Sequence, residues 1–396
     1  MKLTPEICLP EDGTKGTLVG RAWLPGEPPG PALVAVRSDG LWDISAAAPT
    51  MSELLNTADA VGRVCGTPGE RLGDLASILA NSAAEARDPA LPYLLAPCDL
   101  QAVKAAGVTF ATSLLERVIE EQARGDAAKA EGIRQSISAI IGTDLAALKP
   151  GSEAATRIKE VLVARGAWSQ YLEVGIGPDA EVFTKCPPLA AVGLGAEIGI
   201  HPASTWNNPE PEVVLAVNAG GSIVGATLGN DVNLRDVEGR SALLLGKAKD
   251  NNASTAIGPF IRLFDASFGL DDVRRAEVRL EVLGEDGFRL AGASSLGKIS
   301  RDVADLVQQT IGANHQYPDG FLLFTGTMFA PVEDRYQKGG GFTHAVGDIV
   351  TIASPQLGAL VNRVHHCDKI APWTFGAGAL MQNLAARGLL RGRENR

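Results

Sequence analysis

The sequence predicts an α+β protein, rich in strands, in which a small strand-rich domain precedes a larger second domain. A length of 396 residues exceeds that of a usual single domain. The 45 glycines and 23 prolines, with only 5% aromatic residues, favour turns and short strands. Helical periodicity is strongest in one stretch. We therefore place one domain at residues 1–95 and another at 96–396, with a helical insertion at about 113–166.

The first domain is expected to consist of strands because short apolar runs alternate with turn residues. The run Ala32 to Val36 is followed by the turn cluster Ser38 to Gly40. The proline-containing stretch 88–97 is the expected linker to the second domain.

Helical spacing of apolar side chains marks the insertion. Glycine and proline break the pattern at Gly125, Gly142 and Pro150. The positions that define the apolar faces are Leu115, Val118, Ile119, Ile133, Ile137, Ile140, Ile158, Val161 and Leu162.

From about residue 170 onward the pattern is that of strands and hairpins. Apolar and charged residues alternate over 277–282, and this run ends at the turn residues 284–287. A similar alternation at Val350 and Ile352 is followed by a turn at 355–358.

Composition excludes several classes of function. The net charge of −10 offers no basic patch for nucleic acid or for an anionic membrane. No apolar run reaches the ~18 residues of a membrane span, and the N-terminal residues lack the apolar stretch of a signal peptide. The scattered cysteines contain no C-x-x-C pair, so we expect reduced thiols and a cytoplasmic protein. They are Cys8, Cys65, Cys98, Cys186 and Cys367.

The strongest local signal for chemistry is a pair of acids, Glu210 and Glu212, at the entry to the apolar strand 213–217. Side chains at i and i+2 of a strand project to one face, where two like charges repel. A polar turn at 218–222 leads to a second strand that ends at Asp231. Three carboxylates at one end of a hairpin would form an oxygen-rich site for Mg²⁺. The alternative is that the two glutamates are solvated acids on an exposed strand edge.

The register of this hairpin has two possibilities. If Val217 pairs with Val224, Glu210 lies opposite Asp231. If Val217 pairs with Ile223, Asp231 is displaced by one residue and points to the other face. Both registers return Asp231 to the end of the hairpin where the glutamates lie.

A glycine-flanked, asparagine-rich loop at 246–252 carries Lys247 and Lys249. A lysine here could orient a carboxylate or, with its pKa lowered by desolvation, act as a base. Lysines in a polar surface turn are the alternative.

Ser113 and Glu116 have the S-x-x-E spacing of a helix capping box. In that interpretation Ser113 accepts a hydrogen bond from a backbone N–H and Glu116 reaches back to the start of the helix. A catalytic role for the pair is the alternative.

An ordered set of short motifs between about residues 96 and 390 resembles the fumarylacetoacetate hydrolase superfamily. The resemblance implies a catalytic domain with a mixed β-roll fold, Mg²⁺ held by Glu210, Glu212 and Asp231, and an active-site lysine at Lys247. Lys185, Arg235, Asp250 and Thr327 are then expected to bind substrate. The motifs are Phe183-Thr184-Lys185, Glu210/Glu212, Gly229-Asn230-Asp231, Arg235-Asp236, Gly246-Lys247 with Asp250, Thr325-Gly326-Thr327, and Gly347-Asp348 followed by the run to Asn362.

One departure narrows the expected activity. Hydrolases of the family carry N-Y-x-x-H-x-x-E, whose histidine activates water, whereas here Phe110 and Ser113 replace the tyrosine and the histidine, and Glu116 is kept. A serine cannot take up a proton near neutral pH as imidazole does. The sequence is instead similar to the sugar-acid branch of the family, the 2-keto-3-deoxy-pentonate dehydratases.

The resemblance therefore implies Mg²⁺-dependent dehydration of a 2-keto-3-deoxy-D-pentonate, of xylonate or arabinonate type, to 2,5-dioxopentanoate. Mn²⁺ or Ca²⁺ are possible substitutes for Mg²⁺. We expect Lys247 to remove the C3 proton and Glu116 to handle the departing hydroxyl, although the two roles could be exchanged. Ser113 and Thr327 are candidates for hydrogen bonds to substrate.

Two other functions stay open from the sequence. The first is an acylpyruvate hydrolase or oxaloacetate decarboxylase with the same metal chemistry, and the second is a non-catalytic sugar-acid binding protein. In every case the expected partner is a small 2-oxo acid, and the family implies a homodimer or a dimer of dimers.

Overall fold

The structure is a computed structural model with side chains. It describes residues 1–124, 126, 128–130, 132–133, 148–164, 166, 168–329, 331, 333–338 and 340–390. The expected helical positions Ile137 and Ile140, and the expected breaks at Gly125 and Gly142, lie outside these residues. Within the described residues, no helix is long and apolar enough to cross a bilayer.

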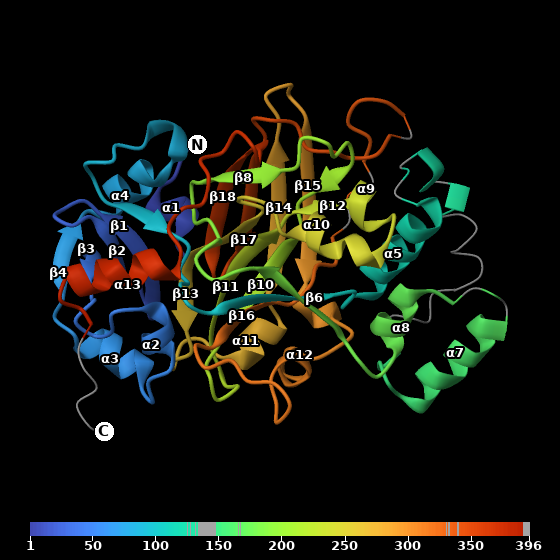
Figure 1. The fold of residues 1–396 in the computed structure, drawn as a ribbon, viewed down its shortest axis with the longest axis horizontal. Coiled ribbons are helices and arrows are strands. Elements are labelled where there is room, and N and C mark those ends of the chain that lie inside the picture. The colour runs from blue at the N-terminus through green and yellow to red at the C-terminus, as the bar shows by residue number, and fades with distance from the viewer. Residues whose placement is uncertain are drawn as a thin grey trace.

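A large mixed sheet of eleven strands, counted over the described residues, extends through the molecule (Figure 1). Its strand order is β4-β3-β2-β1-β13-β11-β10-β16-β6-β7, with β5 also paired to β1. The strands are β1 (Leu18–Leu24), β2 (Gly30–Arg37), β3 (Gly40–Asp43), β4 (Glu70–Gly73), β5 (Tyr93–Leu95), β6 (Ala102–Gly107), β7 (Glu181–Cys186), β10 (Pro211–Val217), β11 (Ile223–Asp231), β13 (Thr255–Leu263) and β16 (Phe321–Phe324).

A second sheet of five strands, in the order β15-β14-β17-β18-β8, packs on the first. One apolar cluster contains residues of both sheets, such as Leu215 and Phe260 from the first and Leu280 and Leu360 from the second, so the sheets share a core. The strands are β8 (Glu197–Ile200), β14 (Glu277–Leu283), β15 (Arg289–Ser295), β17 (Ile349–Ser354) and β18 (Gly358–His366), and a separate short ladder joins β9 (Asn207–Asn208) to β12 (Asn233–Leu234).

Helices cover the ends of this sandwich. Helices α5, α7 and α8 form a group at the end opposite the N-terminal strands (Figure 1), and they enclose an apolar cluster of their own. The helices are α1 (Pro5–Cys8), α2 (Met51–Leu55), α3 (Ala60–Gly66), α4 (Leu75–Ser82), α5 (Ala111–Ala123), α7 (Glu153–Ala164), α8 (Gln170–Ile176), α9 (Arg235–Glu238), α10 (Leu245–Lys249), α11 (Leu270–Arg274), α12 (Val303–Thr310) and α13 (Ala377–Ala386).

The N-terminal strands continue the sheet that carries the later strands. β1 pairs with β13 through Leu18 opposite Arg262 and Val19 opposite Ile261. The stretch 88–97, expected as a linker, contains β5, which pairs with β1. The division at residue 95 therefore stays a prediction, and main-chain hydrogen bonds join the two sides of it.

Several elements expected from the sequence are present. The alternating segment near 277–283 is β14, its glycine turn leads to β15, and β17 and β18 form the later hairpin. Leu115, Val118 and Ile119 lie in α5, and Ile158 and Leu162 lie in α7. Val161, expected on the apolar face, is 49% exposed instead.

The hairpin β10–β11 combines both registers that the sequence allowed. From Pro211 opposite Asn230 to Ala216 opposite Gly225, the pairing is the one that places Glu210 opposite Asp231. An irregularity near the turn then pairs Val217 with Ile223. Because the irregularity lies at the turn, the open end keeps the register in which the three acids meet.

Candidate metal and substrate site

The three predicted metal ligands converge at the open end of the β10–β11 hairpin. Glu210, Glu212 and Asp231 are all buried, and each offers a carboxylate oxygen within 4.8 Å of the other two. The Asp231 N–H donates to the Glu210 carbonyl at 3.0 Å, which closes the ladder next to the acids. The register of the sheet therefore sets the geometry of the cluster.

Glu212 is fixed by the following strand. One of its carboxylate oxygens accepts a hydrogen bond from the Gly326 N–H at 2.6 Å. Gly326 has a φ of +89°, and a Cβ added there would lie 2.0 Å from the Thr109 hydroxyl oxygen. A glycine is thus required where the chain leaves β16 and passes the carboxylate.

The electrostatics of the cluster favour a cation. Burial raises the pKa of Glu212 well above its usual value, and the neighbouring carboxylates of Asp231 and Glu210 raise it further. Three oxygen donors that repel one another in a buried site match the hard-oxygen coordination that Mg²⁺ prefers. The residues present therefore fit a divalent cation.

Lys249, rather than Lys247, is the lysine that reaches the carboxylates. Its ammonium lies 2.5 Å from a Glu210 oxygen and 3.0 Å from an Asp231 oxygen. Burial alone would lower the pKa of Lys249, but Asp231 and Glu210 outweigh burial and raise it. Lys247 lies two residues earlier in α10 with an exposed side chain.

Lys185 also contacts the carboxylate cluster and the end of α10. Its buried ammonium lies 3.2 Å from Asp231 Oδ1 and donates to the main-chain carbonyl of Lys249. It also lies 3.3 Å from the Ser254 hydroxyl. Lys185 thus positions a carboxylate and the end of α10, and the substrate-binding role expected for it stays a prediction.

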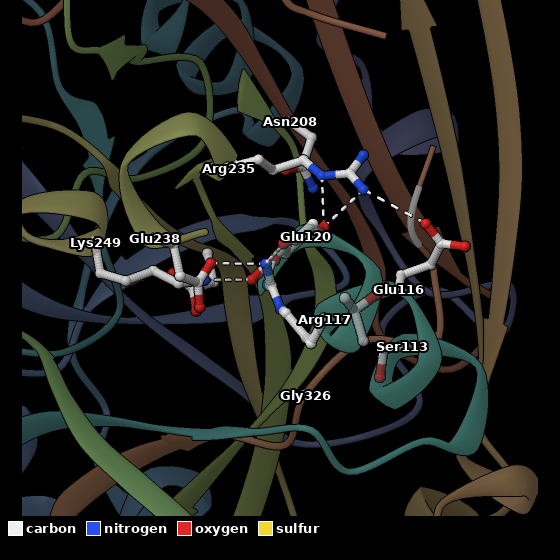
Figure 2. Close-up of polar contacts among 12 residues, drawn as sticks. Ser113, Glu116, Arg117, Glu120, Asn208, Arg235, Glu238, Lys249 and Gly326 are labelled. Atoms are coloured by element: carbon white, nitrogen blue, oxygen red, sulfur yellow. Dashed lines mark hydrogen bonds and ion pairs between the residues drawn. The ribbon is translucent and has the colours of Figure 1, made fainter. Parts of the chain in front are cut away.

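Helix α5 contributes an ion-pair network that includes Arg117, Glu120 and Glu238 (Figure 2). Arg117 contacts the Glu210 carboxylate and pairs with Glu120 and Glu238 at 2.7 Å each. Burial raises the pKa of Glu238, although Arg117 opposes that effect. Arg117 therefore connects α5 to both a predicted metal ligand and helix α9.

Arg235, expected to bind substrate, is held firmly by protein groups. Its guanidinium lies 2.6 Å from Glu120, 3.7 Å from Glu116 and 3.0 Å from the Pro331 carbonyl. The same group lies over the Trp206 ring, 4.3 Å from its centroid, in a cation–π contact. Figure 2 shows Arg235 between Glu120 and Glu116.

A small cavity is lined by residues of both the carboxylate cluster and the ion-pair network of α5. It is lined by five of the predicted site residues, namely Ser113, Glu116, Glu210, Arg235 and Thr327. Asp250 and Lys247 do not line it, and both side chains are exposed.

The capping-box interpretation of Ser113 and Glu116 is wrong. Helix α5 begins at Ala111 after Phe110, so Ser113 lies inside the first turn. The Ser113 hydroxyl donates to the Phe110 carbonyl at 3.0 Å. Ser113 and Glu116 both line the cavity.

The structure adds site residues that the sequence interpretation did not select. Arg117 and Glu120 follow Ser113 at i+4 and i+7, a helical spacing that puts all three on one face of α5 and could have revealed them. Lys249 was visible in the same loop as Lys247, but only the structure shows which lysine faces inward. Asn208 also lines the cavity.

Comparison with known proteins agrees with this architecture. Residues 178–365 match the family model of the fumarylacetoacetate (FAA) hydrolase C-terminal domain. The matched region, a little under half of the chain, is therefore similar to that domain.

Two curated relatives each match about half of the chain. The chain is 30% identical over 190 residues to 2-dehydro-3-deoxy-D-arabinonate dehydratase of Saccharolobus solfataricus, covering 48% of this chain and 60% of the relative. It is 29% identical over 194 residues to a "Probable 2-keto-3-deoxyxylonate dehydratase" of Haloferax volcanii, covering 49% of this chain and 63% of the relative. The match thus spans less than two thirds of either relative.

Solved structures show the same fold over most of the chain. The apo form of 2-keto-3-deoxy-D-arabinonate dehydratase has a TM-score of 0.57 at 19% identity, covering 88% of this chain and 99% of that one. The same enzyme complexed with magnesium and 2,5-dioxopentanoate has a TM-score of 0.56 at 19% identity, with the same coverage. A fumarylacetoacetate hydrolase from Exiguobacterium antarcticum has a TM-score of 0.51 at 15% identity, again with the same coverage.

Proposed function

We propose that this protein is a hydro-lyase that dehydrates a 2-keto-3-deoxy-D-pentonate, of xylonate or arabinonate type, to 2,5-dioxopentanoate with the help of Mg²⁺. The observation that carries the proposal is the convergence of three buried carboxylates and one buried lysine beside a small polar cavity. The two dehydratase relatives support the choice of substrate class.

Glu210, Glu212 and Asp231 would hold the metal ion. A bound Mg²⁺ would act as a Lewis acid that polarises the 2-oxo group and offsets the negative charge that develops when the C3 proton leaves. Mn²⁺ or Ca²⁺ could occupy the same oxygen ligands.

Lys249 is the residue best placed to move the C3 proton, and it takes the role expected for Lys247. Its ammonium and a divalent cation would compete for the same Glu210 and Asp231 oxygens. Positive charge near Lys249 favours its neutral form, in which the amine can accept a proton.

Glu116 would assist the departure of the C4 hydroxyl, which leaves as water once it receives a proton. It lines the cavity on the α5 side, and Arg235 at 3.7 Å orients it. Loss of one proton from C5 and one from the C5 hydroxyl, with return of one proton to C3 and one to C4, then gives the terminal aldehyde, so the net change is the loss of one water molecule.

The α5 side of the cavity favours dehydration over hydrolysis. The hydrolases of the family would need an imidazole at position 113, and the Ser113 hydroxyl is already donating to the Phe110 carbonyl. Among the described residues that line the cavity there is no histidine. A water molecule therefore lacks a side chain of the right pKa to activate it.

The test is a dehydration assay with 2-keto-3-deoxy-D-xylonate and its arabinonate counterpart, coupled to an aldehyde dehydrogenase. We expect turnover to vanish on chelation with EDTA and to return with Mg²⁺. Glu212→Gln keeps an acceptor for the Gly326 N–H but removes a ligand charge, so it should lose both activity and the rise in Tm on adding Mg²⁺. A saturating ligand at 100 times its Kd stabilises by about 2.7 kcal/mol, which a Tm measurement resolves.

Full turnover in excess EDTA would refute the metal-dependent mechanism. Pyruvate formed from an acylpyruvate, with no dehydration of either pentonate, would assign the site to a hydrolase instead. Binding of the pentonates with no product of any kind would indicate a binding protein.

We also propose that the enzyme works in the cytoplasm as a homodimer or a dimer of dimers. The proposal follows from the family and from the five dispersed cysteines, all of which are free. Sedimentation of the purified protein would test the oligomeric state, and a monomer at micromolar concentration would contradict it.

A further inference from the structure

The cavity beside the acids contains a buried hydrogen-bond acceptor that the described residues leave unused. Asn208 is 2% exposed and lines the cavity together with Glu116, Arg235 and Thr327. Within the described part of the chain, its Oδ1 has no hydrogen-bond partner. Buried polar atoms are rarely left unpaired, because desolvation without a partner is costly.

The orientation of the Asn208 amide is fixed by its surroundings. Its Nδ2 donates to the Pro209 carbonyl at 2.9 Å, and exchanging the two ends of the amide would put two oxygens at that distance. The backbone is held in the β9–β12 ladder, where Asn208 pairs with Asn233. Among the residues that the structure describes, Oδ1 is therefore the end of the amide that has no partner.

The charged groups around the cavity leave few free donors. The Arg117 guanidinium is engaged by Glu120, Glu210 and Glu238, and both oxygens of Glu120 are held by arginines. Arg235 donates to Glu120 (Figure 2). It also donates to the Pro331 carbonyl.

The two hydroxyl groups of the cavity each make one hydrogen bond within the protein. The Ser113 hydroxyl donates to a carbonyl, and the Thr327 oxygen accepts from the Phe329 N–H at 3.1 Å. A ligand that enters thus meets an available acceptor at Asn208, while the arginine donors are already used. Such a cavity suits a ligand that brings its own donor.

We infer that Asn208 is a specificity-determining residue whose Oδ1 accepts a hydrogen bond from the terminal hydroxyl of the substrate. The inference rests on the proposed function, in which the 2-oxo acid end binds at the three carboxylates and Glu116 handles the C4 hydroxyl. The hydroxyl left for Asn208 is then the one on C5.

This assignment gives the site a means to reject acylpyruvates. The far end of an acylpyruvate carries a carbonyl, which is an acceptor only and cannot satisfy Asn208 Oδ1. A buried acceptor that loses its partner disfavours the wrong ligand more than the matched hydrogen bond favours the right one. Asn208 would thereby make the site bind hydroxylated sugar acids in preference to dicarbonyl acids.

The test uses two ligands that cannot be dehydrated because neither has a C4 hydroxyl. 5-Hydroxy-2-oxopentanoate and 2-oxopentanoate differ only in the terminal hydroxyl, and each is titrated calorimetrically into the full-length protein with excess MgCl₂. We expect the wild-type protein to bind the hydroxylated ligand about 5- to 100-fold more tightly. Asn208→Leu, of similar size, should abolish this preference and keep the affinity for 2-oxopentanoate.

Asn233→Leu is the matched control. Asn233 is equally buried and lies opposite Asn208 in the ladder, but it does not line the cavity, so the preference should remain. Should Asn208→Leu fail to fold, the wild-type preference still decides the matter, and Asn208→Ala supplies a smaller replacement that also removes the acceptor.

Equal affinity of the wild-type protein for both ligands, no binding of either ligand, or a preference that survives Asn208→Leu would overturn the inference. These results of the binding test can be distinguished from a failure of the proposed function, which the dehydration assay would reveal. A clear hydroxyl preference in a protein that dehydrates neither pentonate would uphold the role of Asn208 and reject the hydro-lyase assignment.

Discussion

At the scale of single residues, the site depends on which side chains face inward from short elements. Helix α10 presents Lys249 to the carboxylates and Lys247 to solvent, although the two are only two residues apart. Residues at i and i+2 on a helix are rotated by about 200°, so they cannot serve the same site. Lys249 is therefore part of the proposed site, and Lys247 is not.

Replacing each lysine by methionine tests this difference. Lys249→Met should lower kcat/KM for the pentonate by about 10²- to 10⁴-fold, the range typical of a lost proton-transfer group. Lys247→Met is the matched control and should leave kcat/KM unchanged. A large loss in Lys247→Met with normal Lys249→Met activity would return the role to Lys247.

His344 gives the protein a pH-dependent stability. The side chain is buried, and burial lowers its pKa even though a hydrogen bond with Asp348 opposes the effect. Below pH about 6.5 the unfolded chain takes up a proton on this residue that the folded protein does not. Stability should thus fall with falling pH below about 6.5, by up to about 1.4 kcal/mol per pH unit.

Urea unfolding at pH 8.0 and pH 5.5 measures this contribution. The difference between wild type and His344→Gln at pH 8.0 gives the pH-independent cost of the substitution. The variant should then lose less stability than the wild type between the two pH values. An identical loss in both proteins would show that His344 does not contribute to it.

At the scale of elements, close strand packing positions the acids. Gly229 lies opposite Glu212 in β11, and a Cβ added there would lie 2.3 Å from Phe324 Cε1 and 2.6 Å from Val214 Cγ2. Both neighbours are fully buried, so neither ring nor methyl group can move aside easily. The absence of a side chain at this position lets β10, β11 and β16 pack closely beneath the site.

Gly229→Ala should therefore destabilise the protein by about 1–3 kcal/mol, the usual cost of overpacking a core. Gly246→Ala is the control, because an added Cβ would have no atom within 4 Å and the residue lies in helix α10. That change should be neutral or stabilising by up to about 1 kcal/mol. Denaturant midpoints for the two variants give the comparison, and a neutral Gly229→Ala would contradict the packing argument.

At the scale of the whole molecule, the N-terminal strands and the site strands share one sheet. Arg262 of β13 strengthens this connection, because its guanidinium contacts Asp12 at 2.7 Å and the Gln356 carbonyl at 2.9 Å. It thus joins the N-terminal segment to the turn between β17 and β18. We expect the first 95 residues and the rest of the chain to unfold together.

Arg262→Met should lower stability by about 1–3 kcal/mol, since it leaves partly buried acceptors unpaired. Hydrogen exchange of peptides from β1 and from β10 should accelerate by the same factor. Arg289→Met, which removes an exposed pair with Glu281, should change stability by less than about 1 kcal/mol. Faster exchange in β1 alone would show that the N-terminal strands open independently.

The sequence alone was sufficient to predict the strand-rich fold class and the hairpin that carries the three acids. Strand alternation and the E-x-E spacing are local patterns, and neighbouring residues on one chain determine them. Only the tertiary structure decided which lysine faces the acids, that Ser113 lies inside α5 rather than at its cap, and that Arg117, Glu120 and Asn208 join the site. These features depend on contacts between elements far apart in the sequence, such as α5 with α9 and β9 with β12, and on which face of each short element is buried when the sheets and helices pack.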